Sequence, residues 1–429
     1  FWYCTSLSTH PLISSRSSKW LALVFVLFWF KVDLLCCKYV ASCTNKFQID
    51  IFPDYKQFYI QHLVDKKKMH FCTNMQVFTQ EELSQLSIHV FQAMGANEAD
   101  AKQAAKVLTS ADIRGIDSHG VSRLIGYVAL WEEGRINMTP DVKIIREHKS
   151  TFTIDGDSGL GLVVAPKAMQ IAIERAKLYG SGWGAIQNSN HFGIAGYHAM
   201  MALPHDMIGM AMTNATPFIP PTYGKEAMLG TNPIAYAFPA GEEMPLVIDL
   251  ATASVARGKI EIARREGKAI PKGWMVDKHG NTSQNIDELK DGGMLTPLGS
   301  LEELGSHKGY ALGGLVDVLT GVLSGANYGK WVPPFVSFLP LLPNLPGKGL
   351  GHFVGAMEIE GFRDTAEFKT SMDHWIQSFK GAKRVRDNQE VYVPGQKEYK
   401  TEAERTVNGI PLNDKVVEDL EGLKKKFGI

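Results

Sequence analysis

Cysteine is absent from most of this sequence. All five cysteines of the 429-residue chain lie before residue 73. The remainder of the chain therefore has no disulfide framework, no thiolate nucleophile and no cysteine-ligated metal. Because chains without disulfides are typical of reducing compartments, we expect a cytoplasmic protein.

Three other absences narrow the function. Basic and acidic residues number 45 each, so the net charge is zero, which argues against a nucleic-acid partner. No strand is followed by Gly-x-Gly-x-x-Gly and a helix, and the glycines at 159, 161 and 347–351 have the wrong spacing for a nucleotide fingerprint. Metal-ligand pairs at i and i+4 are missing as well, so we predict no metal site.

The N-terminal part differs in composition from the rest. Its apolar run, residues 20–30, has about 11 residues and is shorter than the ~20 needed to span a membrane. We interpret residues 1–74 as a leader outside the fold, either disordered or not native, with the functional protein starting near Met69 or Met75. A real membrane or secretory segment is the alternative.

A helical domain is predicted from residues 75–150 together with about 360–429. Thr79 and Glu82 form a capping-box pattern before a helix that stops at Gly95. A second helix follows over 97–113, and a third ends at Gly134. Near the C-terminus we expect a helix over 366–379 and a final helix capped by Asn413.

The middle of the chain, residues 151–359, predicts an α/β domain. Strand patterns alternate with helical patterns, and this alternation is typical of an α/β sheet. The expected strands are 151–154, 184–186, 207–213, 234–238 and 246–248, and the expected helices are 166–179, 194–203 and 313–323. Residues 328–346 are rich in proline and aromatics and predict a loop of undetermined role.

The segment 114–123 concentrates reactive side chains in ten residues. Ser118 and His119 are neighbours, and Arg123 follows four residues after His119. A guanidinium grips a carboxylate bidentately, and an imidazole exchanges a proton near neutral pH. This combination suits the binding and oxidation of a small hydroxy acid. Serine and histidine at the start of a helix are equally common for structural reasons, so that alternative stays open.

Four further positions are candidates with structural alternatives. His191 lies between a strand end and a helix start, where α/β sheets bind ligands. Thr231 sits in the turn Gly230-Thr-Asn-Pro233, and Asp249 ends a strand. Lys308 opens a helix, where a cation is unfavourable unless an anion binds nearby. A hydrogen-bonded core histidine, a plain turn and a helix cap are the alternatives for the first three.

Taken together, the motifs resemble one family, the malate/L-lactate dehydrogenase family, which also contains sulfolactate, ureidoglycolate and Δ1-piperideine-2-carboxylate oxidoreductases. The resemblance covers about residues 75–429. It is carried by Arg114-Gly-Ile-Asp-Ser-His-Gly120 with Arg123, Asp155-Gly-Asp-Ser-Gly-Leu-Gly161, Asn190-His191, Gly230-Thr-Asn-Pro233, Ile248-Asp-Leu-Ala-Thr252 with Gly258-Lys259, Lys308-Gly-Tyr310, Gly349-Leu-Gly-His-Phe353 and Val393-Pro-Gly395.

The resemblance implies a fold, a cofactor and a set of roles. The fold would bind NAD or NADP without being a Rossmann fold, in a homodimer. His191 would be the acid–base histidine, Ser118 and His119 an active-site pair, and Arg123 the carboxylate ligand. Thr231 would contact substrate, and we add Lys308 as a second substrate ligand. Cofactor contacts would come from Phe192, Gly193, Ile194, Ala195, Gly196, Asp249, Leu250, Ala251, Gly309 and Tyr310.

The predicted function is a cytoplasmic NAD(P)-dependent 2-hydroxyacid dehydrogenase, with malate as first substrate and L-lactate as second. If the pKa of His191 stays near that of an ordinary exposed histidine, activity should rise with pH through roughly 6.5–7.5. Some family members have an aspartate near the position of Lys259, which puts a Ser–His–Asp relay in doubt here. The alternatives are a cyclic-imine reductase and a catalytically inactive ligand-binding relative.

Overall fold

The computed structural model describes residues 75–256, 259–260, 263–264 and 267–429. The predictions made for residues 1–74 lie outside the described residues, and so do all five cysteines. Within the described part, helices and strands form a mixed α/β structure, which confirms the predicted class. None of its helices is both long and apolar enough to cross a bilayer.

The predicted N-terminal helices are present. They are α3 (Gln80–Ala93), α4 (Glu98–Ile113) and α5 (Leu124–Glu132). The expected capping box forms at α3, because Thr79 accepts the N–H of Glu82 and Glu82 accepts the N–H of Thr79. Asn97 caps α4 by accepting the N–H of Asp100 at 2.9 Å. Local capping chemistry therefore fixes where both helices begin.

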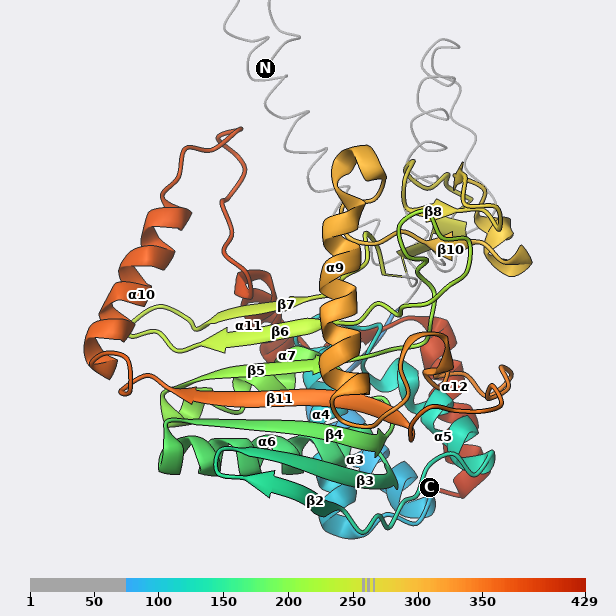
Figure 1. Cartoon of the computed structure of the whole chain (residues 1–429), viewed down its shortest axis with the longest axis horizontal. Coiled ribbons are helices and arrows are strands. Elements are labelled where there is room, and N and C mark those ends of the chain that lie inside the picture. Colours follow the sequence, from blue (N-terminus) through green and yellow to red (C-terminus); the bar gives the residue numbers. More distant parts are fainter. Residues whose placement is uncertain (1–74, 257–258, 261–262, 265–266) are drawn as a thin grey trace, which may run out of the picture. The chain divides into compact units, whose positions relative to one another are not determined.

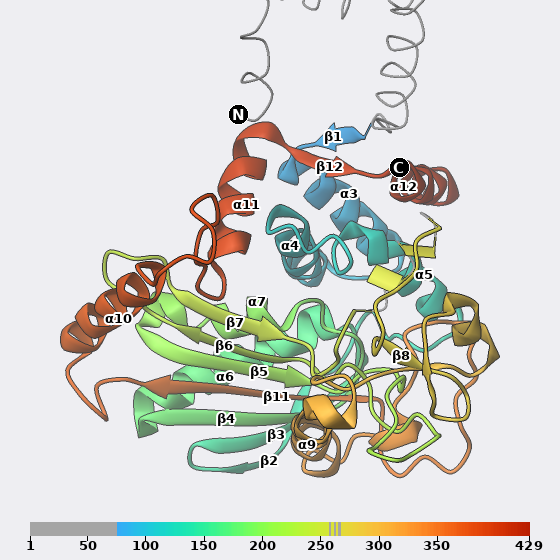
Figure 2. The ribbon, with the colours of Figure 1, turned by 90° about the horizontal axis from the view of Figure 1, so that it is seen from above.

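The C-terminal end of the chain returns to these helices. Strand β12 (Ile410–Leu412) pairs antiparallel with β1 (Gln76–Phe78). Asn413 caps the final helix, α12 (Asp414–Phe427), as predicted. Buried leucines of α12 join the apolar cluster formed by α3, α4 and α5. Figure 2 shows α3, α4 and α12 together on one side of the large sheet.

A seven-stranded mixed sheet forms the centre of the molecule (Figure 1). Its order is β2-β3-β4-β11-β5-β6-β7, in which β3 and β4 are parallel and the other neighbours are antiparallel. The predicted strands are all present, several of them longer than expected. The strands are β2 (Lys143–His148), β3 (Thr151–Gly159), β4 (Ser181–Ser189), β5 (Met207–Thr213), β6 (Ile234–Phe238), β7 (Leu246–Leu250) and β11 (Leu350–Glu358).

The sequence pattern does not predict β11, although it lies in the middle of the sheet. Most of its residues are buried, so the strand lacks the apolar–polar alternation of a strand with one exposed face. Its glycines allow close packing. A Cβ on Gly351 would lie 1.8 Å from the carbonyl oxygen of Thr320, and one on Gly355 would lie 2.4 Å from the ring of Trp183.

Helices cover both faces of the sheet (Figure 1). On one face, α6 (Gly161–Tyr179) and α7 (Ala195–Met200) bury a cluster that includes Ala211 of β5. On the other face, α9 (Ser306–Asp317) packs Val316 against Met210 and Met212 of the same strand. Alternating residues of β5 thus point to different helices, as strand geometry requires. The helix predicted over 313–323 begins earlier, at Ser306, and continues after Asp317 as a π-helical turn over Val318–Val322.

A small three-stranded sheet lies beside the large one. It contains β8 (Met275–Val276), β9 (Thr282–Ser283) and β10 (Met294–Leu295) in the order β10-β8-β9. Met275 and Leu295 belong to a separate apolar cluster together with Ile219 and Leu229. Leu229 of this cluster directly precedes the turn that contains Thr231.

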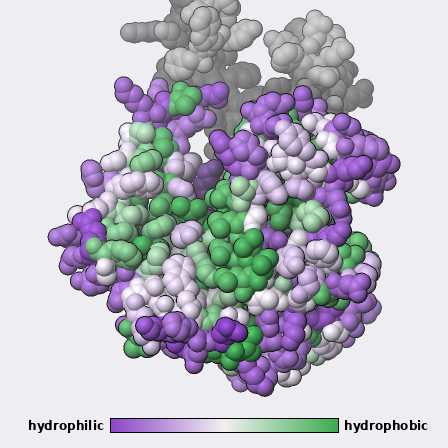
Figure 3. Space-filling view, in the orientation of Figure 1, coloured by the Kyte–Doolittle hydropathy of each residue, from purple (hydrophilic) through white to green (hydrophobic). Residues whose placement is uncertain are grey.

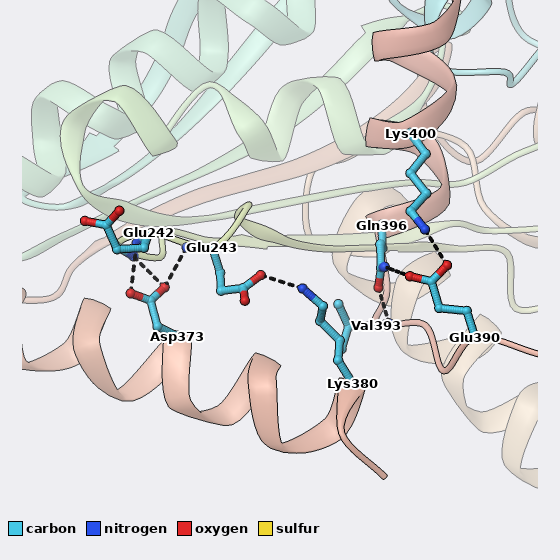
Figure 4. A network of polar contacts seen from close by, with 9 residues as sticks. Glu242, Glu243, Asp373, Lys380, Glu390, Val393, Gln396 and Lys400 are labelled. Atoms are coloured by element: carbon cyan, nitrogen blue, oxygen red, sulfur yellow. Dashed lines mark hydrogen bonds and ion pairs between the residues drawn. The ribbon is translucent and has the colours of Figure 1, made fainter. Parts of the chain in front are cut away.

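Two C-terminal helices hold the β7 side of the sheet, α10 (Thr365–Lys380) and α11 (Gln396–Asn408). Asp373 of α10 accepts the backbone N–H groups of Gly241, Glu242 and Glu243 in the β6–β7 turn. Figure 4 shows Asp373 beside Glu242 and Glu243. Lys380 pairs with Glu243 at 2.8 Å. These bonds attach α10 to the end of the hairpin.

Candidate active site

The 114–123 segment lies between α4 and α5, and a carboxyl group beneath it fixes its shape. Asp112 Oδ2 accepts the N–H of Val121 at 2.8 Å. Oδ1 of Asp112 is buried and has no hydrogen-bond partner in the described part of the chain. A Cβ on Gly120 would lie 1.9 Å from Oδ1, so only glycine fits there.

The loop brings its predicted site residues together. Ser118 Oγ lies 2.9 Å from Nδ1 of His119. Nε of Arg123 donates to the backbone carbonyl of Ser118, which holds the guanidinium beside the loop. On the other flank, Asp117 forms an ion pair with Arg405 of α11. The C-terminal helix therefore contributes to the position of the loop.

His191 follows the end of β4 and faces the same loop. Its ring is stacked with that of His119, with centroids 5.7 Å apart and planes at 21°. The hydroxyl of Tyr127 lies 2.7 Å from Nδ1 of His191, and the N–H of Gly193 points to the same nitrogen at 3.3 Å. Asn190 Nδ2 donates to the carbonyl of Ser158 at 2.8 Å, which fixes the chain just before the histidine. The predicted group of Ser118, His119, Arg123 and His191 is thus formed in space.

The 328–346 segment, whose role the sequence leaves open, covers this group. The Phe335 ring lies 4.3 Å from that of His191 and 6.0 Å from the guanidinium carbon of Arg123. Arg135 donates to the carbonyls of Val336, Ser337 and Leu339 and so holds the loop against α5. The loop therefore walls the histidine site with an aromatic ring.

A cavity of about 330 Å³ opens beside His191. Its polar wall is the end of β4, with Asn188, Ser189 and Asn190. Its apolar wall is the 328–346 loop, including Phe335. The volume lies in the range of small-molecule sites, roughly 300–1,000 Å³. The arrangement provides a basic ring nitrogen, a nearby guanidinium and a partly apolar chamber.

Burial keeps both histidines neutral. Burial lowers the pKa of His119 to about 4, and the charge of Arg123 adds to the effect. Burial also lowers the pKa of His191 well below its ordinary value, with His119 and Arg123 contributing, even though the ring borders the cavity. A ligand carboxylate that neutralised Arg123 would raise both pKa values.

Part of the predicted cofactor set lines a second cavity of about 420 Å³. Asp249 Oδ2 accepts the N–H of Gly196 at 2.7 Å. Desolvation raises the pKa of the Asp249 carboxyl to about 6, although the residue stays open to the cavity. A Cβ on Gly196 would lie 2.7 Å from that carboxylate, so the backbone is bare here. The predicted cofactor residues on this wall are Ile194, Gly196, Asp249 and Leu250. A backbone segment without a side chain, next to a carboxyl group at the end of a strand, is suited to bind part of a dinucleotide.

Other predicted site residues make contacts elsewhere. Phe192 is fully buried between the rings of His198 and His352, at 4.5 and 4.7 Å. The carbonyl of Thr231 accepts the N–H of Thr252 at 2.9 Å. Lys308 is exposed in the first turn of α9. In the described part of the chain, no hydrogen bond or ion pair joins Thr231 or Lys308 to the two histidines.

Three residues at the site were not predicted from the sequence: Tyr127, Arg135 and Phe335. Tyr127 lies four residues after Arg123 on α5, a spacing that places both on one helix face. That spacing was the available signal, but a buried aromatic in a helix is more often core. Arg135 and Phe335 reach the site through the 328–346 loop, which has no periodicity, and no sequence pattern indicates the contacts of either residue. Among the described residues, no group of acidic, histidine or cysteine side chains suits a metal ion.

Comparison with known proteins gives consistent matches. The family model described as malate/L-lactate dehydrogenase matches residues 78–421. Malate dehydrogenase of Pyrococcus abyssi is 42% identical over 350 residues, covering 81% of this chain and 94% of that protein. Malate/(S)-sulfolactate dehydrogenase of Methanothermus fervidus is 37% identical, covering 82% and 98%. The crystal structure of malate dehydrogenase from Entamoeba histolytica superposes with a TM-score of 0.77 at 32% identity, covering 83% and 99%.

Proposed function

The chain belongs to the malate/L-lactate dehydrogenase family and is an oxidoreductase, and from this premise we propose that it oxidises small 2-hydroxy acids with NAD or NADP, malate first. The observation that carries the proposal is the stacked His119–His191 pair with Arg123 close by, in which His191 and the neighbouring Phe335 line a ligand-sized cavity. A carboxylate clamp and a proton acceptor are the two groups that 2-hydroxyacid oxidation requires. L-Lactate is the second candidate substrate.

The roles follow from the geometry. Arg123 grips the substrate carboxylate, with its guanidinium held in place by the Ser118 carbonyl. His191, neutral because of burial, accepts the hydroxyl proton. Ser118 and His119 orient the substrate from the loop. Binding of the carboxylate neutralises Arg123, and the imidazolium then costs less free energy at the step where it forms.

A nicotinamide cofactor, when bound, supplies the hydride acceptor for this reaction. We propose that Ile194, Gly196, Asp249 and Leu250 hold it at the second cavity. Backbone at Gly193 and Ala195 would border it, and Ala251, Gly309 and Tyr310 would extend its site toward α9. Thr231 and Lys308 would contact the substrate, or the anionic group that it carries, from the same side. Because the side chain of Phe192 is buried, this residue would contact the cofactor through its backbone.

We infer that this cofactor site is not a Rossmann site. Most neighbours in the sheet are antiparallel, whereas Rossmann sheets are mostly parallel, and the glycine fingerprint is missing. We also propose two domains, a helical one from residues 75–150 and about 360–429 and a cofactor-binding one from 151–359. Two apolar clusters support this division, one behind the sheet and one in the helices, which also takes in Leu160, Leu162 and Val163 where the two domains meet.

We propose that the protein is a cytoplasmic homodimer. Apolar side chains gather over α9 on the face shown in Figure 3. A row of exposed apolar residues along α9 and the following turn supports a protein contact there, because such patches mark interfaces. The row is Leu312, Leu315, Val318, Val322 and Leu323.

The activity is tested by a substrate panel read through NAD(P)H absorbance. Malate, L-lactate, sulfolactate and a cyclic imino acid are each assayed with both nicotinamide cofactors. We expect turnover with malate to exceed the other substrates. Absence of NAD(P)H formation with every hydroxy acid would favour an inactive relative, and turnover confined to the cyclic imine would favour a reductase.

The carboxylate clamp is tested by Arg123→Ala and Arg123→Lys. Loss of a charge-assisted pair in a partly dry site costs about 2–5 kcal/mol. We therefore expect kcat/KM to fall by roughly 10²–10³ in the alanine variant with the fold intact. Lysine should recover little, because an ammonium lacks the planar fork. Near-normal kcat/KM in Arg123→Lys would show that Arg123 does not bind the carboxylate bidentately.

A further inference from the structure

Tyr127 places a hydroxyl behind His191. The side chain is fully buried on α5, with its ring 4.9 Å from that of Phe335 and 6.3 Å from that of Phe91. A buried tyrosine hydroxyl needs hydrogen-bond partners, because leaving it unpaired costs free energy. Here both partners belong to His191: Nδ1 at 2.7 Å and the backbone carbonyl at 3.4 Å.

These two partners allow two hydrogen-bond patterns. In the first, the hydroxyl donates to Nδ1, the N–H of Gly193 points to the same nitrogen, and the proton of the neutral ring lies on Nε2. In the second, Nδ1–H donates to the tyrosine oxygen, the hydroxyl hydrogen turns to the carbonyl of His191, and the N–H of Gly193 loses its acceptor on the ring. Nε2 then carries a lone pair.

Only the second pattern suits a general base. In the oxidation, the substrate O–H bond breaks and a new N–H bond forms at Nε2, while the hydride leaves the α-carbon for the nicotinamide. The resulting imidazolium keeps its Nδ1–H on Tyr127. In the reverse direction, Nε2–H returns its proton to the substrate oxygen. In the described part of the chain, Nε2 of His191 makes no hydrogen bond, and the residue lines the cavity.

We propose that Tyr127 is a positioning residue whose hydroxyl, by changing from donor to acceptor toward Nδ1, selects the His191 tautomer that receives the substrate proton. This rests on the proposed function, in which His191 is the base. The tyrosine itself stays protonated, because burial raises the pKa of its phenol above the ordinary value. Among the described residues, the recorded hydrogen bonds at Nδ1 of His191 are those with Tyr127 and Gly193, whereas His119, Arg123, His198 and His352 act on the ring electrostatically.

Tyr127→Phe removes the oxygen and keeps the ring contacts. The N–H of Gly193 then remains on Nδ1 and favours the tautomer protonated at Nε2, which has no lone pair for the substrate. We expect kcat for malate oxidation to fall about 10- to 100-fold, less than the roughly 10²–10⁴ for complete loss of a general base. KM should change by less than about twofold, because the Arg123 clamp is intact.

The tautomer itself is measured by NMR of protein labelled with ¹⁵N-histidine, with the His191 signals assigned by their loss in His191→Asn. In the wild type we expect a population with Nδ1 protonated. In Tyr127→Phe we expect the Nε2-protonated form to dominate. Identical His191 nitrogen shifts in the two proteins, or unchanged kcat, would overturn the inference.

A matched control separates this role from a structural one. Thr109→Val removes another buried hydroxyl of the same helical cluster, one that donates to the carbonyl of Ala105 at 3.0 Å. It should leave kcat and the His191 tautomer unchanged, and an equal loss in this variant would also overturn the inference. Wild-type protein inactive on all 2-hydroxy acids would refute the proposed function instead, while the NMR comparison would still test Tyr127.

Discussion

At the scale of single residues, the chemistry depends on histidines kept neutral by burial. The sequence alone predicts a pH limb at the pKa of an ordinary exposed histidine, roughly 6.5–7.5. The structure corrects this expectation, because burial and the charges of His119 and Arg123 lower the pKa of His191 well below that range. The free enzyme therefore holds its base in the neutral form throughout the physiological range.

For hydroxy-acid oxidation, we expect kcat/KM to stay flat between roughly pH 6.5 and 8 and to fall only in more acidic buffer, as His191 becomes protonated. Initial rates from about pH 8 down into acidic buffer, as far as the protein stays folded, measure this. His191→Asn should lower kcat by about 10²–10⁴ and abolish the acid limb. His119→Asn should lower kcat by less and should keep the acid limb of the pH profile. The reverse result for the two variants would assign the base to His119.

At the scale of elements, the buried carboxyl under the 114–123 loop links loop shape to pH. Burial raises the pKa of Asp112 to about 8, with Asp117 adding to the effect and the N–H of Val121 and Arg405 opposing it. The unfolded chain has an ordinary value near 3.9. The folded state therefore binds the extra proton, and this contribution to stability is lost as pH rises toward the folded pKa.

The amide in the Asp112→Asn variant cannot ionise, so the variant should lack this dependence of stability on pH. Relative to the variant, the wild type should lose about 1.4 kcal/mol of unfolding free energy per pH unit between pH 6 and 7, and less per unit as the pH approaches 8. Urea denaturation of both proteins at pH 6, 7 and 8 measures the difference. A constant offset between the proteins is expected from the amide itself. Parallel pH curves would mean that Asp112 is ionised in the folded protein.

Sequence patterns predict the elements that have a capping residue or a short uninterrupted apolar run. The ends of α3 and α4 follow from Thr79, Glu82 and Asn97, and the bounds of β5 and β6 are as expected. The pattern fails for β11, which is covered on both sides, and for α11, which buries no residue fully. In β11, glycines and His352 interrupt the apolar run, and in α11 the few apolar residues stand among many charged ones.

The site shows the same division. Ser118, His119 and Arg123 are close in sequence, so their spacing predicts that they cluster. Their meeting with His191 and Phe335 depends on the sheet and on a long loop. Contacts between segments far apart in the chain produce no recognisable spacing in the sequence. The family resemblance supplies the role of His191, and nothing in the pattern supplies that of Phe335.

At the scale of the whole molecule, the apolar row on α9 predicts self-association. Light scattering should give twice the 47.4 kDa chain mass for the wild type. Leu315→Glu places a charge in the row and should shift the mass toward that of one chain, because burying an unpaired carboxylate is costly. Leu178→Glu, at an exposed leucine of α6, is the control and should not. A dimer that persists in Leu315→Glu would place the interface elsewhere.

The segment between α10 and α11 also explains why the large sheet ends at β7. A Cβ on Gly395 would lie 3.1 Å from both the nitrogen and the oxygen of Val247, so the chain at Val393-Pro-Gly395 covers the outer side of that strand. Proline has no N–H to continue a ladder. The open polar groups of an edge strand are a template for pairing with other chains and for aggregation. At Val247 they are shielded by a segment that cannot itself become an eighth strand, which protects this edge of the sheet from pairing with a neighbouring chain.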